Sequence, residues 1–94
     1  MHDLPYFNLA FSQILRNYRE HARITQMSLA VAIGGSEVAI RRMERGVQTP
    51  TVTTFILLAK ALSVSPAAFL AAIIDRMEAL AYTATDSEEL SLKP

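Results

Sequence analysis

The segment that most constrains this chain is residues 25–46, TQMSLAVAIGGSEVAIRRMERG, which has the pattern of two short helices on either side of a glycine turn. Gly34 can adopt the positive φ that ends the first helix and turns the chain. Ala30 is small enough to let the two helices cross closely. Ile40 and Met43 recur at helical spacing and would face the first helix. The second helix is therefore expected to keep its opposite side free.

Two short helices joined in this way form a helix-turn-helix, in which the second helix enters the major groove of DNA. Paired arginines, Arg41 and Arg42, lie on the free part of that second helix. Arginine can donate two hydrogen bonds to guanine O6 and N7. The segment therefore predicts a DNA-binding motif.

The rest of the chain is also patterned as helix, without strand-like alternation of useful length. A first helix is expected from about Tyr6 to Ala22. Hydroxyl residues that can accept from unpaired backbone N–H groups precede the second and third helices, and Gly46 ends the third. These predicted caps are Thr25 and Ser36.

Two further helices are expected after Gly46. The Thr-Pro-Thr of residues 49–51 would begin the fourth, and Ser65 followed by Pro66 would begin the fifth, which runs to about Ala81 or Tyr82. The predicted core face of the fourth helix consists of Val52, Phe55, Leu58, Ala59 and Leu62. The chain is thus predicted to be all-α, with a domain over residues 1–82 and an acidic, disordered tail over residues 83–94.

Charge is distributed unevenly although the net charge of the 94 residues is zero. Residues 16–45 hold six arginines against three glutamates, a local +3, whereas residues 75–94 hold five acidic against two basic residues, a local −3. A basic module followed by an acidic tail is the result. The sequence lacks cysteine, an export signal and an unbroken apolar run long enough to span a membrane, so a cytoplasmic protein without a membrane partner is expected.

Residues 15–65 resemble the Cro/repressor-type (XRE-like) helix-turn-helix family of bacterial and phage transcriptional regulators. The resemblance is carried by LRNYRE, TQMSLA, AIGGS, IRRMERG, TP and LLAKALSVS. It implies a compact five-helix DNA-binding domain, here with an extended C-terminal helix, that acts as a dimer.

The resemblance also implies roles for individual residues. Arg19 and Glu44 match a structural ion pair that joins the first helix to the end of the third. Contacts to base edges are implied for Ser36, Glu37, Val38, Arg41 and Arg42. Contacts to the sugar-phosphate backbone are implied for Gln26, Arg45, Gln48, Thr49 and Thr51. Arg23 stands where the family often has glycine, so it either adopts the turn at some cost or reaches a phosphate.

The fifth helix suggests how two copies would associate. Leu70, Ile73, Met77 and Leu80 follow a three-four spacing that makes a narrow apolar seam. Met77 and Leu80 are expected to extend beyond the core of one small domain, so we expect them to lie in a homodimer interface. Its predicted residues are Leu57, Leu70, Ile73, Ile74, Met77 and Leu80.

The sequence contains no recognisable catalytic set, phosphate loop or metal cluster, so no enzyme activity, cofactor or metal is expected. A sequence-specific transcriptional regulator is predicted, most simply a dimeric repressor that binds a pseudo-palindromic operator on double-stranded DNA. The alternative is an antitoxin or adaptor module that binds a protein partner through its C-terminal helix and tail.

Overall fold

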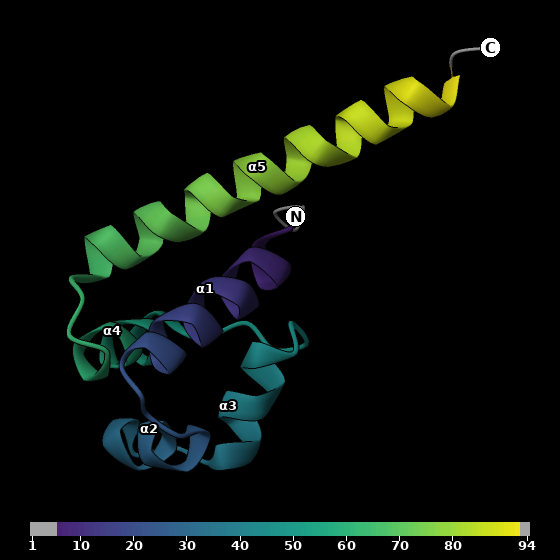
Figure 1. The fold of residues 1–94 in the computed structure, drawn as a ribbon. Coiled ribbons are helices and arrows are strands. Elements are labelled where there is room, and N and C mark those ends of the chain that lie inside the picture. Colours follow the sequence, from purple (N-terminus) through teal and green to yellow (C-terminus); the bar gives the residue numbers. More distant parts are fainter. Residues whose placement is uncertain (1–5, 93–94) are drawn as a thin grey trace.

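The computed structural model describes residues 6–92, and the side chains within residues 6–84. Over this part of the chain it contains α-helices and connecting turns and no strand, which confirms the all-α prediction. The helices are α1 (Phe7–His21), α2 (Gln26–Ile33), α3 (Glu37–Glu44), α4 (Val52–Ala61) and α5 (Pro66–Leu92). Their arrangement is shown in Figure 1.

Each helix from α2 to α5 begins after a serine or threonine, as predicted. The side-chain oxygen of that residue accepts a hydrogen bond from the backbone N–H three residues later, at 3.0–3.1 Å. This satisfies one of the N–H groups that the first turn leaves without a partner. The capping residues are Thr25, Ser36, Thr51 and Ser65.

Four helices end in a left-handed residue, and only two of these residues are glycine. Gly34 after α2 and Gly46 after α3 have φ of +68° and +77°, as expected. Arg23 after α1 and Ser63 after α4 have φ of +57° and +58°. A side chain in this region costs about 1–2 kcal/mol relative to its ordinary conformation. Arg23 therefore does adopt the turn, the first of the two alternatives considered for it.

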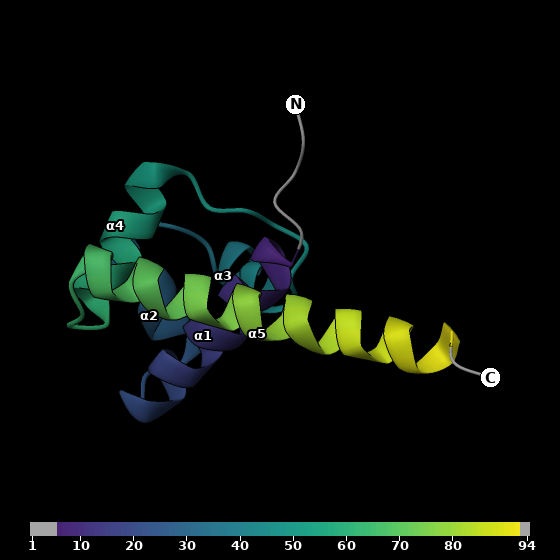
Figure 2. The same ribbon diagram turned by 90° about the horizontal axis from the view of Figure 1, so that it is seen from above.

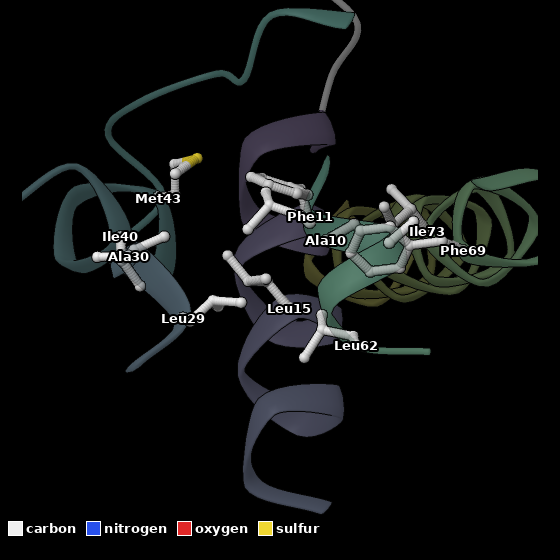
Figure 3. Close-up of a cluster of buried hydrophobic side chains, with 12 residues drawn as sticks. Ala10, Phe11, Leu15, Leu29, Ala30, Ile40, Met43, Leu62, Phe69 and Ile73 are labelled. Carbon is white, nitrogen blue, oxygen red and sulfur yellow. The ribbon is translucent and has the colours of Figure 1, made fainter. Parts of the chain in front are cut away.

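Helix α1 is the centre of the fold. Figure 3 shows Phe11 and Leu15 of α1 between the buried side chains of α2 and α3 on one side and those of α4 and α5 on the other. A cluster of phenylalanine rings fills the second side, with Phe55 and Phe69 stacked at a centroid distance of 4.9 Å. The helix-turn-helix is therefore held by α1, which packs against α3, and by α4, which packs against α2, rather than by α5.

The structure corrects two expectations at the ends of the fold. Val52 was assigned to the core face of α4, but it lies in the first turn of that helix and is 77% exposed. Helix α5 was expected to end near Tyr82, but it continues to Leu92 and extends past α1 in both ribbon views (Figures 1 and 2). The molecule is consequently elongated, with principal extents of 53 × 27 × 22 Å.

Candidate nucleic-acid interface

The first two turns of α3 present an exposed face. Ile40 and Met43 fix the opposite face of the helix because both are buried in the core. Val38 is 49% exposed, and Arg41 and Arg42 are also exposed. The α3 residues predicted to read bases therefore lie on the side of the helix that faces solvent, while Ser36 caps its N-terminus.

The charged groups on this face are engaged differently. Arg41 Nη2 donates to Glu37 Oε1 at 3.1 Å, one helical turn away. Within the described residues, Arg42 and Arg45 form no ion pair or side-chain hydrogen bond, and both are exposed. Arg42 is thus free to bind a group outside the chain, and Arg41 is held by its neighbour.

The last turn of α3 is built around a buried carboxylate. The side chain of Glu44 is 0% exposed, and Arg19 of α1 donates to both of its oxygens, from Nε at 2.5 Å and from Nη2 at 2.9 Å. Arg19 Nη1 also donates to the backbone oxygen of Ile24 at 2.9 Å. The structure thus brings together the pair that the resemblance implied, and it ties α1, the α1–α2 turn and α3 to one another.

Two further residues contribute to this site, and the sequence alone did not identify their contacts. Gln26 Nε2 donates to Glu44 Oε1 at 3.1 Å, and Arg16 Nε lies 3.5 Å from the same oxygen. Gln26 was expected to contact a phosphate, and in this structure its amide is anchored to Glu44. Only a pairing across 18 residues, which a linear pattern does not reveal, places it there.

Electrostatics keep the Glu44 carboxylate ionised. Burial acts to raise the pKa of Glu44, but hydrogen bonds from Arg19 and Gln26 and the charge of Arg19 outweigh it, so the pKa lies below the ordinary value of 4.5. The hydrogen bonds from Arg19 to Glu44, with the negative charges of Glu44 and Glu20, raise the pKa of Arg19 against the effect of its own burial. Both groups are therefore charged at neutral pH.

The loop after α3 is held to the start of α1. Thr49 Oγ1 donates to Asn8 Oδ1 at 2.7 Å, and a Cβ on Gly46 would lie in ordinary van der Waals contact with the Asn8 backbone oxygen, at 3.6 Å. Arg45 is exposed, Gln48 is half-buried, and Thr51 caps α4. Asn8 was not predicted to contribute, because the contact joins residues 41 positions apart.

The predicted dimer residues divide into two groups. Ile73 is 0% exposed and belongs to the core of its own chain, so its assignment to an interface is wrong. Met77 and Leu80 are partly buried and pack against the same core, contrary to the expectation that the domain explains them poorly. Leu57, Leu70 and Ile74 are 39–42% exposed and remain available to a partner.

Within residues 6–84, no single helix is long and apolar enough to span a membrane. Helix α4 and the Pro66–Ala84 part of α5 pass that test only as a pair, and the pair is bent by 104°. The same described residues contain no cluster of three or more histidine, cysteine or acidic side chains that could hold a metal ion.

Comparison with known proteins identifies the family. Residues 15–69 match the model of the helix-turn-helix family. The structure is similar to the clp gene regulator ClgR from Corynebacterium glutamicum, with a TM-score of 0.84 and 24% identity over 94% of both chains. A second ClgR structure has a TM-score of 0.72 and 25% identity, covering 82% of this chain and 99% of that one.

The wild-type restriction-modification controller protein C.Esp1396I has a TM-score of 0.70 and 24% identity, covering 77% of this chain and 95% of that one. No match was found among curated protein sequences. The members of the family and the proteins in these structures are regulators rather than enzymes. Because the family model covers more than half of the chain, the protein belongs to the XRE-type helix-turn-helix family of DNA-binding transcriptional regulators.

Proposed function

We propose that the protein binds DNA sequence-specifically as a homodimer, with α3 in the major groove, and represses transcription at a pseudo-palindromic operator. The observation that carries the proposal is the division of α3. Ile40 and Met43 are buried and Glu44 is anchored, whereas Arg42 lies on the exposed face and its side chain has no partner among the described residues. A rigid helix with an exposed, unpaired arginine is suited to reading the major groove. Such a regulator would act in the cytoplasm.

Arg42 is the proposed principal reader. Its guanidinium is the one on α3 without an internal partner among the described residues, so a bidentate bond to guanine breaks nothing in the protein. Val38 is suited to contact with a thymine methyl group. Phosphate contacts are proposed for residues around the turn and the following loop, where they set register rather than sequence. They are Gln26, Arg45, Gln48, Thr49 and Thr51.

An Arg42→Ala variant tests this assignment. Operators are first selected from random duplex DNA by the wild-type protein, and affinities are then measured by fluorescence anisotropy. The variant should lose about 1–3 kcal/mol on the selected operator and relax the preference at one position of each half-site.

A Lys60→Ala variant removes an exposed cation at the end of α4 and is the matched control, with unchanged binding expected. If Arg42→Ala weakens binding to all sequences equally, Arg42 contacts the backbone and the base reader lies elsewhere.

The proposed dimer interface is the exposed apolar surface formed by Leu57 on α4 and by Leu70 and Ile74 on α5. Leu70 and Ile74 are four residues apart and therefore share one face of the helix. Pairing two copies would double the basic charge offered to DNA. It would also place two α3 helices about 34 Å apart, the spacing of successive major grooves.

Sedimentation of an Ile74→Asp variant tests this interface. The buried aspartate would oppose association without entering the core, so the mass should fall from that of a dimer to that of a monomer. Val31→Asp places the same charge on an exposed apolar residue of α2 and should leave the mass unchanged. A dimeric mass for Ile74→Asp would contradict the interface.

A further inference from the structure

Glu37 is an unusual residue to find on a DNA-binding face. The backbone of DNA is polyanionic, so an exposed carboxylate that approaches it is repelled. In this structure the carboxylate does not stand alone, because Arg41 Nη2 donates to it at 3.1 Å. Both side chains remain accessible, with 31% of Glu37 and 52% of Arg41 exposed. The pair is thus locally neutral and open to a ligand.

We infer that Glu37 and Arg41 act together as one reading unit for a single G·C base pair. The inference rests on the proposed function, because it assumes that α3 enters the major groove. It assigns a joint role to two side chains that would otherwise be treated as separate contacts. The unit presents hydrogen-bond donors and an acceptor next to each other.

The hydrogen-bonding groups of the pair match the edge of G·C. In the major groove guanine offers two acceptors, N7 and O6, beside the N4 donor of cytosine. Arg41 uses one of its five N–H donors on Glu37 and keeps the others, and the carboxylate of Glu37 retains lone pairs for N4. An A·T pair places the adenine N6 donor opposite arginine and the thymine O4 and methyl group opposite the carboxylate. Arg41 then keeps only the N7 acceptor and Glu37 loses its donor, so both contacts weaken together.

The ion pair also lowers the conformational entropy that Arg41 loses when it binds DNA. A free arginine side chain loses up to about 2 kcal/mol of rotamer freedom when it is fixed at an interface. Glu37 already restricts Arg41, so less of that freedom remains to be lost when DNA binds. Among the described residues, no side chain restricts Arg42 in this way. Glu37 is accordingly a positioning residue for Arg41 as well as a contact to cytosine.

A double-mutant cycle on selected operators tests the unit. Wild type, Glu37→Ala, Arg41→Ala and the double variant are titrated against the selected duplex and against duplexes with each G·C pair changed to A·T. Wild type should discriminate at one such pair by about 5- to 150-fold, the range for a good bidentate contact. Each single variant should lose most of this ratio at the same base pair. The double variant should lose no more of this ratio than either single variant does.

The controls separate this role from a general charge effect. Arg45→Ala removes an exposed positive charge outside the pair, so it should weaken binding to all duplexes and leave the ratio intact. Losses at different base pairs, or losses that multiply in the double variant, would overturn the inference. A uniform gain in affinity for Glu37→Ala, with the ratio unchanged, would also overturn it.

Circular dichroism of each variant should show the helical content of the wild type, because neither side chain is buried in the core. Failure of the wild-type protein to select any sequence would overturn the proposed function itself, and the reading unit with it. Selection by the wild type together with independent effects of the two residues would overturn only the reading unit.

Discussion

The two ends of α3 carry the same residue type and use it in opposite ways. Glu37 in the first turn is partly exposed and pairs with Arg41 on the same helix. Glu44 in the last turn is fully buried and binds Arg19 from a helix 25 residues earlier in the chain. Local contact leaves the first pair available to an external ligand. Long-range contact makes the second pair part of the fold.

The difference shows how a short helix can be both rigid and accessible. An α-helix of eight residues is marginal by itself and depends on tertiary packing. Glu44, with Ile40 and Met43, supplies that packing at one end and along one side. The first turn is then held in place without contributing its own charged side chains to the core.

The largest expected effect is the loss of the buried pair. Arg19→Ala leaves the Glu44 carboxylate without its main partner, which should lower the free energy of unfolding by about 3–5 kcal/mol. Arg41→Ala breaks only the exposed pair and should change the free energy of unfolding by less than about 1 kcal/mol. Urea unfolding followed by circular dichroism measures both.

The two variants together test the contrast between the ends of α3, because each removes one arginine from one glutamate. Glu78→Ala, on the exposed face of α5, is a control for the removal of a charged surface side chain outside both pairs. Equal destabilisation by Arg19→Ala and Arg41→Ala would break the comparison.

A smaller effect is expected from acid, which removes the charge of Glu44 but keeps its side chain. The pKa of Glu44 is lowered on folding, so its contribution to stability is complete above the ordinary value of about 4.5 and is lost as the pH falls toward the folded value. Unfolding free energies should therefore decrease below pH 4.5 in the wild-type protein. A Glu44→Gln variant should start from a lower stability and show a shallower decrease. Parallel pH profiles would show that Glu44 does not carry this dependence.

The smallest effect concerns the turn that Arg19 connects to the buried end. Arg23 has a φ of +57° in the turn after α1, and replacing it with glycine should raise the free energy of unfolding by about 1 kcal/mol. Ala22, its neighbour, has an ordinary helical φ of −76°, so Ala22→Gly should lower the stability by a similar amount. Thermal unfolding of the two variants compares them directly. A loss of stability in Arg23→Gly would mean that the arginine side chain contributes more than its backbone costs.

Local signals accounted for most of the fold. Each predicted cap, from Thr25 to Ser65, depends on a hydroxyl residue and the N–H three positions later, so neighbouring residues suffice. The register of α5 was harder to predict. A three-four apolar spacing passes through both Ile73 and Ile74, and only the position of α1 decides that Ile73 is buried and Ile74 exposed. The prediction that Val52 belongs to the core was wrong because the first turn of α4 lies beyond the core.

The candidate site shows the same limit. The resemblance supplied the residues of α3 and the pairing of Arg19 with Glu44, while the contacts of Gln26 with Glu44 and of Asn8 with Thr49 needed the tertiary structure. Their partners lie 18 and 41 residues away, and neither residue type indicates a particular partner.

The most direct test of the account is a fluorescence-anisotropy titration of the wild-type protein with the DNA upstream of its own gene, beside a scrambled duplex, at two salt concentrations. If the free face of α3 reads DNA, binding to the native duplex should be tighter by a hundredfold or more and should weaken steeply with salt as counterions are released. Equal, weak binding to both duplexes would show that the operator does not lie upstream of the protein's own gene. The same result with duplexes selected from random DNA would contradict the role of α3 as a reader of sequence.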